Sequence, residues 1–457
     1  MTGLQQMAPG LSSPGRRYRA YSAKHLDGLT ARAGLDASER LAVRAVATVL
    51  PFRTNEYVVD HLIDWDAAPD DPIYRLVFPQ ADMLPAEDVA EIAGLLAREA
   101  TGDEVRAAAH AVRARLNPHP AGQLALNIPE LADEPLPGVQ HKYAETVLVF
   151  PKQGQTCHAY CTYCFRWAQF VDEPDLKMAT DDMTRITAYL RQHPEVTSVL
   201  LTGGDPMIMG AAVLRRYIEP LLDPDLGHIE SVRIGTKSLG YWPQRFASDP
   251  DSDDTLRLFE EVVASGKSLA LMAHFSHPRE LESSLVADAV RRVRATGAVI
   301  RTQAPLIRSI NDDPITWADM WRTQMRLGMI PYYMFVERDT GPQGYFAVPL
   351  ARGHEVFRDA YASVSGLCRT VRGPSMSATP GKVCIDGVVE VAGEKVFALH
   401  MIQARNPDLV GKPFFARFDP TAIWLSDLEP AFAPRFPFEP EPATVPGQWA
   451  PEMLAMS

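Results

Sequence analysis

Three of the chain's five cysteines lie within one stretch of eight residues. They occupy the segment "CHAYCTYC" as Cys157, Cys161 and Cys164, whereas Cys368 and Cys384 lie far downstream. The spacing C-x3-C-x2-C places three thiolates on one short loop, and such a loop can hold three corners of a [4Fe–4S] cluster. The fourth iron would then lack a protein ligand and be open to a substrate or cofactor. The motif therefore predicts chemistry at a cluster rather than simple electron storage.

A structural zinc site is the alternative reading of these cysteines. Such sites normally close with four Cys or His ligands in paired short spacings. His158 lies within the loop, but no second pair follows at a suitable distance. The five cysteines are odd in number and clustered, so they do not make a disulfide framework, and a reducing compartment would keep them free. The cluster is therefore the preferred interpretation.

Composition limits the partners of such a site. The chain has 457 residues, 46% hydrophobic and 22% charged, with a formal net charge of −12. An acidic protein has no general basic surface for a phosphate backbone or an anionic membrane, so nucleic acid and membrane partners are not expected. There is no apolar run of membrane-spanning length, and the N-terminal segment lacks the apolar stretch of an export signal. A cytoplasmic location is expected.

The segments around the cysteine loop alternate between short apolar runs and amphipathic helices from about residue 144. This pattern is typical of a parallel sheet built from strand–helix units. The expected strands are "ETVLVF", "TSVLLTG", "SVRIGT", "LALMAHF", "AVIRTQA" and "IPYYMF", and helices are expected near 182–193, 210–222, 253–265, 280–296, 314–327 and 354–366. Six consecutive units without a marked switch point favour a partial (βα)6 TIM-like barrel over a doubly wound sheet. Catalytic groups of such barrels collect at the carboxyl ends of the strands.

The chain divides into three expected regions. Residues 1–140 are expected to form a mainly helical accessory region, in which Thr101 and Glu104 resemble a capping box. Residues 141–390 are expected to form the barrel, and residues 391–457 a C-terminal extension. Because this extension is rich in proline from residue 428, it is expected to be an extended strap or a disordered end.

The cysteine loop after a first barrel strand, with an aromatic Tyr163 before the last cysteine, resembles that of the radical S-adenosylmethionine (SAM) enzymes. Within them, residues 50–385 resemble the lysine 2,3-aminomutase family. The segments that carry this resemblance are "LPGVQHKYAETVLVF", "LLTGGDPM", "VRIGTKSLGYWPQR", "AHFSHPRE", "RTQAPLIRSINDD" and "PYYMFVERD", in this order. The resemblance implies a [4Fe–4S] cluster that cleaves SAM to a 5′-deoxyadenosyl radical, and pyridoxal 5′-phosphate (PLP) as second cofactor.

The resemblance also implies where SAM binds. In the "TGGDP" turn two glycines allow a ligand to approach the backbone, and in the family this turn binds the amino group of SAM. Similar residues in the family at the ends of the third, fourth and fifth strands contact SAM or the adenosyl group. The candidate SAM residues are Gly203, Gly204, Asp205, Thr236, His274 and Gln303. Gly204→Val is expected to block SAM binding and to leave the cluster intact.

For PLP, the resemblance implies an attachment lysine, and Lys382 in "SATPGKVCIDG" matches it. The loop before it departs from the family, because only Pro380 and Gly381 stand where a longer glycine run is usual. Tyr143 matches an aromatic residue near PLP. Lys142 replaces a family arginine at the phosphate, and Thr146 stands where another basic residue is usual, so the phosphate site also departs.

The substrate residues follow from the same comparison. Arg166 matches the family arginine that binds the substrate α-carboxylate, which suits a planar guanidinium. In lysine-specific relatives two aspartates recognise the distal ammonium, and the matching positions here are Arg338 and Ser375. Lysine is therefore expected to be a poor substrate, and an anionic or neutral side chain is preferred. Glu337 and Asp339 flank the first position, so an inserted residue would change the match.

The leading hypothesis is a radical SAM amino acid 2,3-aminomutase, an isomerase that moves an amino group from C2 to C3. The alternative enzyme is a PLP-independent radical SAM protein that abstracts hydrogen from another small substrate. A cluster protein limited to electron transfer or regulation is a third class, which the retained SAM segments disfavour. An external electron donor such as flavodoxin or ferredoxin is expected, and a homo-oligomer is left open.

Overall fold

The computed structural model describes residues 18–171, 173 and 177–440. Its centre is an open mixed sheet with the strand order β15-β14-β13-β12-β11-β10-β9-β8-β7-β6-β5. The strands from β6 to β12 run parallel, and antiparallel strands extend both edges. Their bounds are β5 (Val139–Tyr143), β6 (Thr146–Val149), β7 (Ser198–Leu201), β8 (Ser231–Thr236), β9 (Ser268–His274), β10 (Val299–Leu306), β11 (Ile330–Val336), β12 (Arg372–Ser377), β13 (Gly381–Val391), β14 (Glu394–Ala404) and β15 (Pro413–Arg417). The expected α/β class is confirmed.

A helix follows each of the strands β6 to β11, as the alternating pattern predicts. These helices are α6 (Met183–Gln192), α7 (Ala211–Ile218), α10 (Ser252–Ala264), α11 (Ser284–Ala295), α12 (Pro314–Arg326) and α14 (Leu350–Ala362). The side chains of Asp182, Ser283 and Asp313 cap the backbone at the start of α6, α11 and α12. Apolar faces of helices and strands form one continuous core. Short helices α8 (Ser238–Tyr241), α9 (Gln244–Ala247) and α13 (Gln343–Phe346) occupy the connecting loops.

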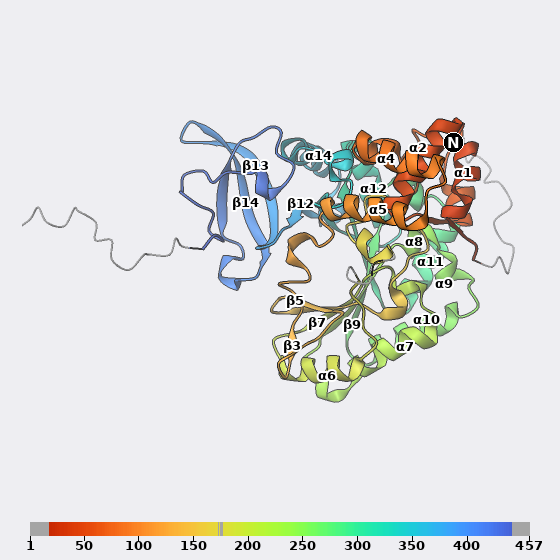
Figure 1. The fold of residues 1–457 in the computed structure, drawn as a ribbon. Coiled ribbons are helices and arrows are strands. Elements are labelled where there is room, and N and C mark those ends of the chain that lie inside the picture. The colour runs from red at the N-terminus through yellow and green to blue at the C-terminus, as the bar shows by residue number, and fades with distance from the viewer. Residues whose placement is uncertain (1–17, 172, 174–176, 441–457) are drawn as a thin grey trace, which may run out of the picture.

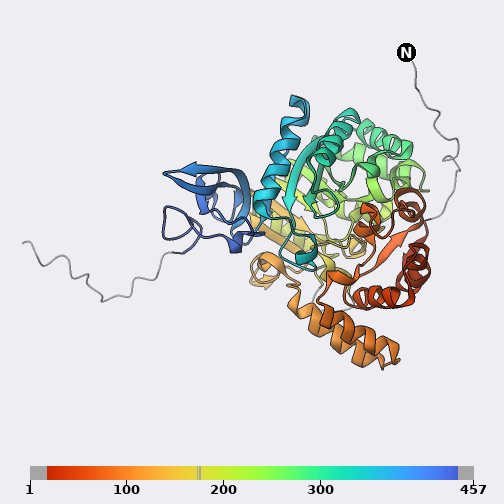
Figure 2. The same cartoon turned by 90° about the horizontal axis from the view of Figure 1, so that it is seen from above.

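The N-terminal region forms a layer at one end of the sheet (Figure 1). It contains β1 (Ala20–Ser22), α1 (Leu26–Arg32), α2 (Ala37–Val49), β2 (Arg53–Asn55), a π-helical turn (Val58–Leu62), α3 (Pro72–Val77), α4 (Ala86–Ala97), α5 (Gly102–Arg115), β3 (Glu130–Leu131) and β4 (Glu134–Pro135). The helices α4 and α5 lie side by side (Figure 2). The capping box expected at Thr101 and Glu104 is confirmed at the start of α5. The helical prediction is wrong between residues 116 and 140, where the chain forms turns and short strands.

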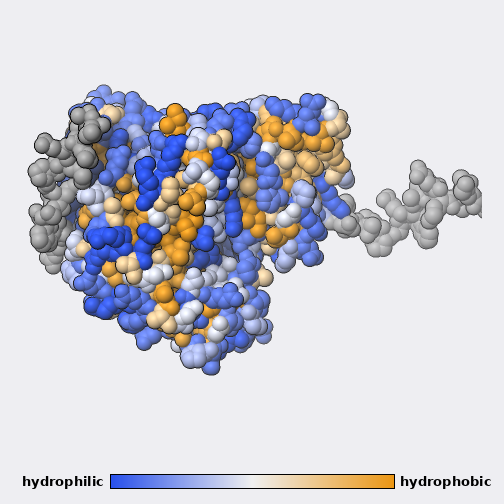
Figure 3. Space-filling view, turned by 180° about the vertical axis from the view of Figure 1, so that it is seen from behind, coloured by the Kyte–Doolittle hydropathy of each residue, from blue (hydrophilic) through white to orange (hydrophobic). Residues whose placement is uncertain are grey.

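The C-terminal part extends the sheet beyond the parallel strands. The strands β13 and β14 form a long hairpin, and the boundary expected at residue 391 falls at its tip, where it divides two paired strands. A separate hydrophobic cluster on this hairpin draws on residues from Val336 to Phe436. Apolar surface also gathers over this part of the molecule, at the right of Figure 3, where Val389, Val410 and Phe432 are exposed.

The proline-rich segment from residue 428 packs against this hairpin as far as it is described. Pro430 forms a β-bridge with Ala416, and Leu428 and Phe436 are buried. The expected extended strap therefore fits residues 428–440, whereas residues 441–457 lie outside the described residues. None of the described helices is both long enough and apolar enough to cross a lipid bilayer.

Candidate active site

The three clustered cysteines lie on the loop that follows β6. The backbone N–H of Cys164 donates to the Cys161 carbonyl at 3.0 Å, and the N–H of Trp167 donates to the Cys164 carbonyl at 3.0 Å. Consecutive tight turns therefore fix the second and third cysteines relative to each other. Cys157, Cys161 and Cys164 are all free and partly exposed, so the structure brings the expected cluster ligands together on one accessible loop.

The N-terminal layer holds the cysteine loop from its outer side. Tyr160 N–H donates to the Arg53 carbonyl at 2.8 Å, and Thr162 N–H donates to the Leu76 carbonyl at 2.9 Å. The Tyr163 ring belongs to the hydrophobic cluster that joins this loop to the N-terminal helices. The accessory region therefore shields the loop from water and fixes its backbone.

The thiols are not arranged for a single metal ion. Among the described residues, the groups of three or more potential ligands within 4.8 Å of one another do not include Cys157, Cys161 and Cys164. A zinc ion bound at about 2.3 Å to each sulfur would need sulfur atoms within roughly 4.6 Å of one another. The wider spacing suits a four-iron cluster better than a structural zinc.

Burial keeps these thiols protonated when no cation is bound. It raises the pKa of Cys164 to about 12, and burial together with the nearby Asp205 carboxylate raises the pKa of Cys157 well above its ordinary value. Binding of iron must therefore displace thiol protons, and the cluster's own positive charge is what stabilises the thiolates.

The glycine pair after β7 packs directly against the cysteine loop. A Cβ atom on Gly204 would clash with the Thr156 backbone and would approach the Gly154 carbonyl oxygen to 2.8 Å. Gly203 has φ +128°, a conformation that favours glycine. That Gly204→Val spares the cluster stays a prediction, and this contact argues against it, because a larger side chain would press on the backbone immediately before Cys157.

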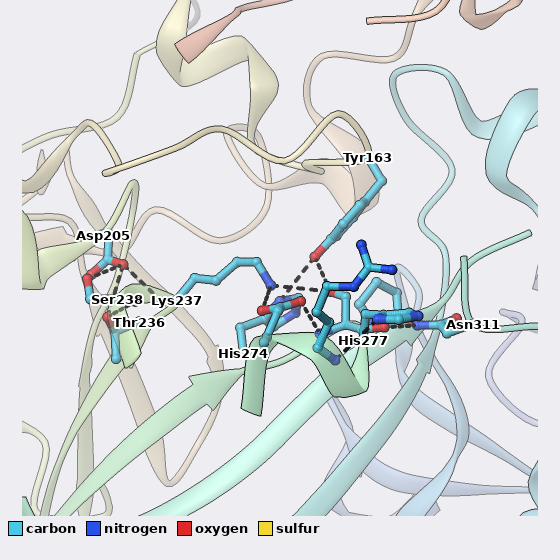
Figure 4. A network of polar contacts seen from close by, with 12 residues as sticks. Tyr163, Asp205, Thr236, Lys237, Ser238, His274, His277 and Asn311 are labelled. Atoms are coloured by element: carbon cyan, nitrogen blue, oxygen red, sulfur yellow. Dashed lines mark hydrogen bonds and ion pairs between the residues drawn. The ribbon is translucent and has the colours of Figure 1, made fainter. Parts of the chain in front are cut away.

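Asp205 joins the ends of β7 and β8 (Figure 4). Its Oδ2 atom accepts hydrogen bonds from Thr236 Oγ1 at 2.9 Å, from the Lys237 N–H at 2.9 Å and from Ser238 Oγ at 3.0 Å, and its Oδ1 accepts from the Met207 N–H at 2.9 Å. Asp205 and Thr236 are both buried. Their side chains thus hold the shape of the strand ends at which SAM is expected.

His274 and Gln303, two of the candidate SAM residues, lie side by side, as a shared SAM site requires. They are paired in the parallel register of β9 and β10, and His274 Nδ1 lies 3.1 Å from the Tyr163 hydroxyl of the cysteine loop. Burial and the Lys237 ammonium lower the pKa of His274 well below its usual range, so the ring is neutral. One detail is wrong: Gln303 does not end its strand, because β10 continues to Leu306.

A buried ion pair next to these residues escaped the sequence analysis. Lys237 Nζ lies 2.7 Å from Glu280 Oε2, and the side-chain exposures are 11% and 0%. The ammonium also lies 4.2 Å from the centre of the Tyr241 ring. Lys237 and Glu280 both lie in segments that resemble the family, but 43 residues separate them, and no local spacing shows that they pair.

Arg166, which is buried, and Arg338, which is partly buried, flank one aromatic ring beside the cysteine loop. The guanidinium carbons of Arg166 and Arg338 lie 4.8 Å and 5.0 Å from the centre of the Phe165 ring. Arg166 Nη1 and Arg338 Nε are buried and have no hydrogen-bond partner among the described residues. Burial and the charge of Arg338 lower the pKa of Arg166 to about 10. The pair therefore presents two cations with unused donors.

Two carboxylic acids stand beside Arg338 in the sequence, and Asp339 attracts its guanidinium more strongly than Glu337 does. Burial raises the pKa of Glu337 well above its usual range, which favours the neutral acid. Asp339 lies toward the end of α5, where its carbonyl accepts a hydrogen bond from Asn117 Nδ2 at 2.6 Å. The same segment is fixed to the cysteine loop, because Trp167 Nε1 donates to Thr340 Oγ1 at 2.9 Å. This arrangement supports Arg338 rather than Asp339 as the residue that faces the site.

Lys382 lies in β13 within a group of cations that we call the basic cluster. Its Nζ lies 4.2 Å from the centre of the Tyr333 ring. Burial, followed by the charges of Arg233 and Arg372, lowers the pKa of Lys382 to about 7. Burial and neighbouring cations likewise lower the pKa of Lys142 to about 7. The basic cluster consists of Lys142, Arg233, Arg338, Arg372, Lys382 and Arg405.

Lys142 and Thr146, which differ from the family at the expected phosphate site, have a further cation, Arg233, nearby. Lys142 Nζ donates to the Ala378 carbonyl on the segment before Lys382, and it lies 5.4 Å from the centre of the Tyr143 ring. Arg233, on β8, lies next to Thr146, the position at which a basic residue was expected. Its Nη2 is 3.4 Å from Thr146 Oγ1. Arg233 Nε is buried and has no hydrogen-bond partner among the described residues. An anion with several oxygens would satisfy these donors.

Ser375 does not share the surroundings of Arg338. It is fully buried in β12, where it pairs with Phe335 on one side and with Cys384 on the other. Its hydroxyl lies 3.5 Å from the Met334 carbonyl. The structure therefore places Ser375 inside the sheet, and its match to the second aspartate stays a prediction.

Comparisons with known proteins agree with this geometry. A relative from Aquifex aeolicus, provisionally named L-lysine 2,3-aminomutase, is 32% identical over 390 residues, which are 85% of this chain and 90% of that protein. The L-lysine 2,3-aminomutase of Clostridium subterminale is 28% identical over 240 residues, 52% of this chain and about half (54%) of that protein. A solved radical SAM methyltransferase from Sphaerobacter thermophilus is 16% identical, with a TM-score of 0.34, over 50% of this chain and 65% of that one. No protein-family model matches the chain.

The cysteine loop, the α/β sheet and these relatives define a radical SAM isomerase. The chain belongs to the lysine 2,3-aminomutase family. The cofactors of this family are a [4Fe–4S] cluster and SAM, with PLP typical of its lysine aminomutases. Its members act on a small molecule and depend on an external reductant.

Proposed function

We propose that this isomerase is a PLP-dependent 2,3-aminomutase that acts on a free amino acid. The observation that carries the proposal is Lys382, a partly buried amine of the basic cluster, whose Nζ lies 4.2 Å from the centre of the Tyr333 ring and whose pKa is lowered to about 7 by burial and neighbouring cations. Buried like charges are unfavourable unless an anion compensates them. PLP combines a phosphate, which suits the cations, with an aldehyde, which bonds to a neutral lysine.

Each part of the basic cluster has a role in this proposal. When bound, PLP supplies the π system through which an amino group shifts between neighbouring carbons. Lys382 holds the aldehyde carbon. Arg233 and Lys142 hold the phosphate, and Arg233 replaces the basic residue that is absent at Thr146. Tyr143 lines the pocket from below Lys142.

The radical half of the site lies at the other strand ends. We assign Cys157, Cys161 and Cys164 to the cluster and Gly203, Gly204, Asp205, Thr236, His274 and Gln303 to the SAM site. The family's cluster and SAM together supply the radical that removes hydrogen from the substrate. In this proposal the parallel strands β6 to β11 are the partial barrel, and the N-terminal layer excludes water from its mouth.

Arg166 and Arg338 connect the two halves. Arg166 neighbours Cys164, whereas Arg338 neighbours both Arg166 and Lys382 electrostatically. We assign Arg166 to the substrate α-carboxylate and Arg338 to the substrate side chain. Two cations with unused donors suit a substrate with an acceptor-rich or anionic side chain rather than an ammonium.

Lys382→Ala is expected to abolish the visible PLP absorbance that borohydride bleaches, because the only attachment amine is removed. The iron–sulfur absorbance should persist, since the three cysteines of the loop remain in place. The matched control is Lys395→Ala, an exposed lysine on the partner strand of the same hairpin. Equal PLP absorbance in wild type and Lys382→Ala would remove Lys382 from this role, and no PLP in either would favour the PLP-independent alternative.

Attachment of PLP is expected to accelerate about tenfold between pH 6 and pH 8 and then to level off. An amine with a pKa of about 7 is roughly one-tenth neutral at pH 6 and nine-tenths neutral at pH 8. Only the neutral amine attacks the aldehyde. The measurement is the rate of PLP absorbance change after mixing apoprotein with PLP over a pH series. A rate that keeps rising beyond pH 9 would show that Lys382 titrates like an ordinary exposed lysine.

A further inference from the structure

Outside this site, three potential metal ligands meet on the C-terminal hairpin. Cys384 on β13 lies directly opposite His400 on β14, and Asp386 follows two residues later on β13. The ligand atoms of the three side chains all lie within 4.8 Å of one another. His400 Nδ1 and Asp386 Oδ2 are 2.7 Å apart. Since facing residues of an antiparallel pair share one side of the sheet, the strand register brings these side chains together.

The three side chains offer sulfur, nitrogen and oxygen ligands, a mixture that suits a transition metal ion. A thiolate, an imidazole and a carboxylate are the ligands that zinc takes in proteins. Burial and Asp386 raise the pKa of Cys384, so an ion must displace the thiol proton, and the resulting thiolate and carboxylate charges match one divalent cation. Cys384 is only 6% exposed, whereas the side chains of Asp386 and His400 are 46% and 31% exposed. An ion can therefore enter from the solvent side and bind against a buried sulfur.

Space for a further ligand lies next to Asp386. A surface groove of about 320 Å³ is bounded by Asp386, Gly373 and by His354 of α14. The His354 ring contacts the Asp386 backbone. Three protein ligands with an open neighbouring volume leave a fourth position for water or for a side chain from α14.

We propose that Cys384, Asp386 and His400 bind a single divalent transition metal ion, of which zinc fits best. The ion links β13 to β14 two residues beyond Lys382, so its role is to fix the hairpin that carries this lysine. The proposal concerns a site separate from the cysteine loop and does not rest on the assignment of PLP.

The first test is elemental analysis of the full chain after reconstitution of the cluster and dialysis against zinc. We expect an equimolar amount of zinc besides the cluster iron, and its loss in His400→Ala and in Asp386→Asn. The control is His193→Ala, because His193 forms a similar surface pair with Glu195 at 2.8 Å but has no cysteine beside it. Absence of zinc from the wild type would overturn the proposal and leave an ordinary surface ion pair.

The second test identifies the sulfur ligand with Co²⁺ as probe. In the full chain with Cys157→Ser, Cys161→Ser and Cys164→Ser, no cluster absorption interferes. We expect Co²⁺ to produce a thiolate-to-cobalt band that Cys384→Ser removes and Cys368→Ser retains. A band that survives Cys384→Ser, or no band at all, would contradict the site. If this background does not fold by circular dichroism, Cys384→Ser and Cys368→Ser in the cluster-containing chain decide by zinc content.

Discussion

Alanine in place of Cys157, Cys161 or Cys164 is expected to remove the iron–sulfur chromophore and to abolish SAM cleavage. The loop after β6 supplies all three thiolates, and a cluster that loses one of its three protein ligands is not retained. The measurements are iron content and visible absorbance after anaerobic reconstitution, followed by the yield of 5′-deoxyadenosine on reduction. We expect loss of both signals in each variant.

The matched control is Cys368→Ala. Cys368 is 1% exposed and belongs to the core of the sheet, where its sulfur lies 3.7 Å from Ser365 Oγ. Because it removes a buried thiol elsewhere in the chain, this variant separates loss of a ligand from loss of packing. It should retain the chromophore and SAM cleavage. If Cys368→Ala folds normally but loses the chromophore, the assignment of ligands to the loop is wrong.

The alternation of strands and helices was predictable because short segments of the sequence determine it. In β8, for example, every second residue is buried, and the pattern Ser-Val-Arg-Ile-Gly-Thr shows this alternation directly. The helix starts at Asp182 and Asp313 also follow from local capping chemistry. These signals act over a few residues, so they need no knowledge of the tertiary structure.

The end of β10 shows where local reasoning fails. Pro305 usually marks the limit of a strand, because it lacks the backbone donor that a sheet ladder needs. Here Pro305 stays in the strand and pairs with Phe335, and the register shifts between Thr302 and Gln303. Pairing with β11 continues to Leu306 although pairing with β9 ends at Gln303, so contact with one neighbouring strand overrides the local signal and Gln303 lies inside its strand.

The cysteine motif and the strand-end residues were found from the sequence, but the arginines around the proposed PLP site were not. Arg233 reaches Thr146 across 87 residues of sequence, because β7 alone separates their strands in the sheet. Arg405, directly after β14, donates to the Thr379 carbonyl next to the Lys382 loop. No spacing rule links such residues. Only the order and register of the strands reveal that they are neighbours.

The preference for a side chain without positive charge depends on the electrostatics around Arg338. Burial favours the neutral form of Glu337, so Asp339 is the acidic neighbour that attracts Arg338, and the backbone carbonyl of Asp339 is fixed by Asn117. Like charges about 5 Å apart repel by roughly 3 kcal/mol at an effective dielectric constant of about 20. That energy corresponds to about 100-fold in kcat/KM if it acts fully in the transition state.

Wild-type enzyme is therefore expected to turn over glutamate, aspartate or glutamine at least about 100-fold more efficiently than lysine. Arg338→Asp should reverse the order by restoring a carboxylate where lysine-specific relatives carry one. The measurement is kcat/KM for glutamate, aspartate, glutamine, arginine and lysine with the reconstituted enzyme. Arg338→Gln should fall between the two, because it removes the charge and keeps a hydrogen-bond donor.

The control for this charge reversal is Arg326→Asp, an exposed arginine at the end of α12 that lies outside the site. It changes the net charge by the same amount, so it should leave the order of substrates unchanged. Iron–sulfur and PLP absorbance, measured on every variant, report whether the cofactors remain bound. Efficient lysine turnover by the wild type would show that Arg338 does not exclude a positively charged substrate side chain. Because lysine turnover still requires hydrogen abstraction and amino transfer, that outcome would remain consistent with the proposed aminomutase activity. Other residues would then select the substrate side chain.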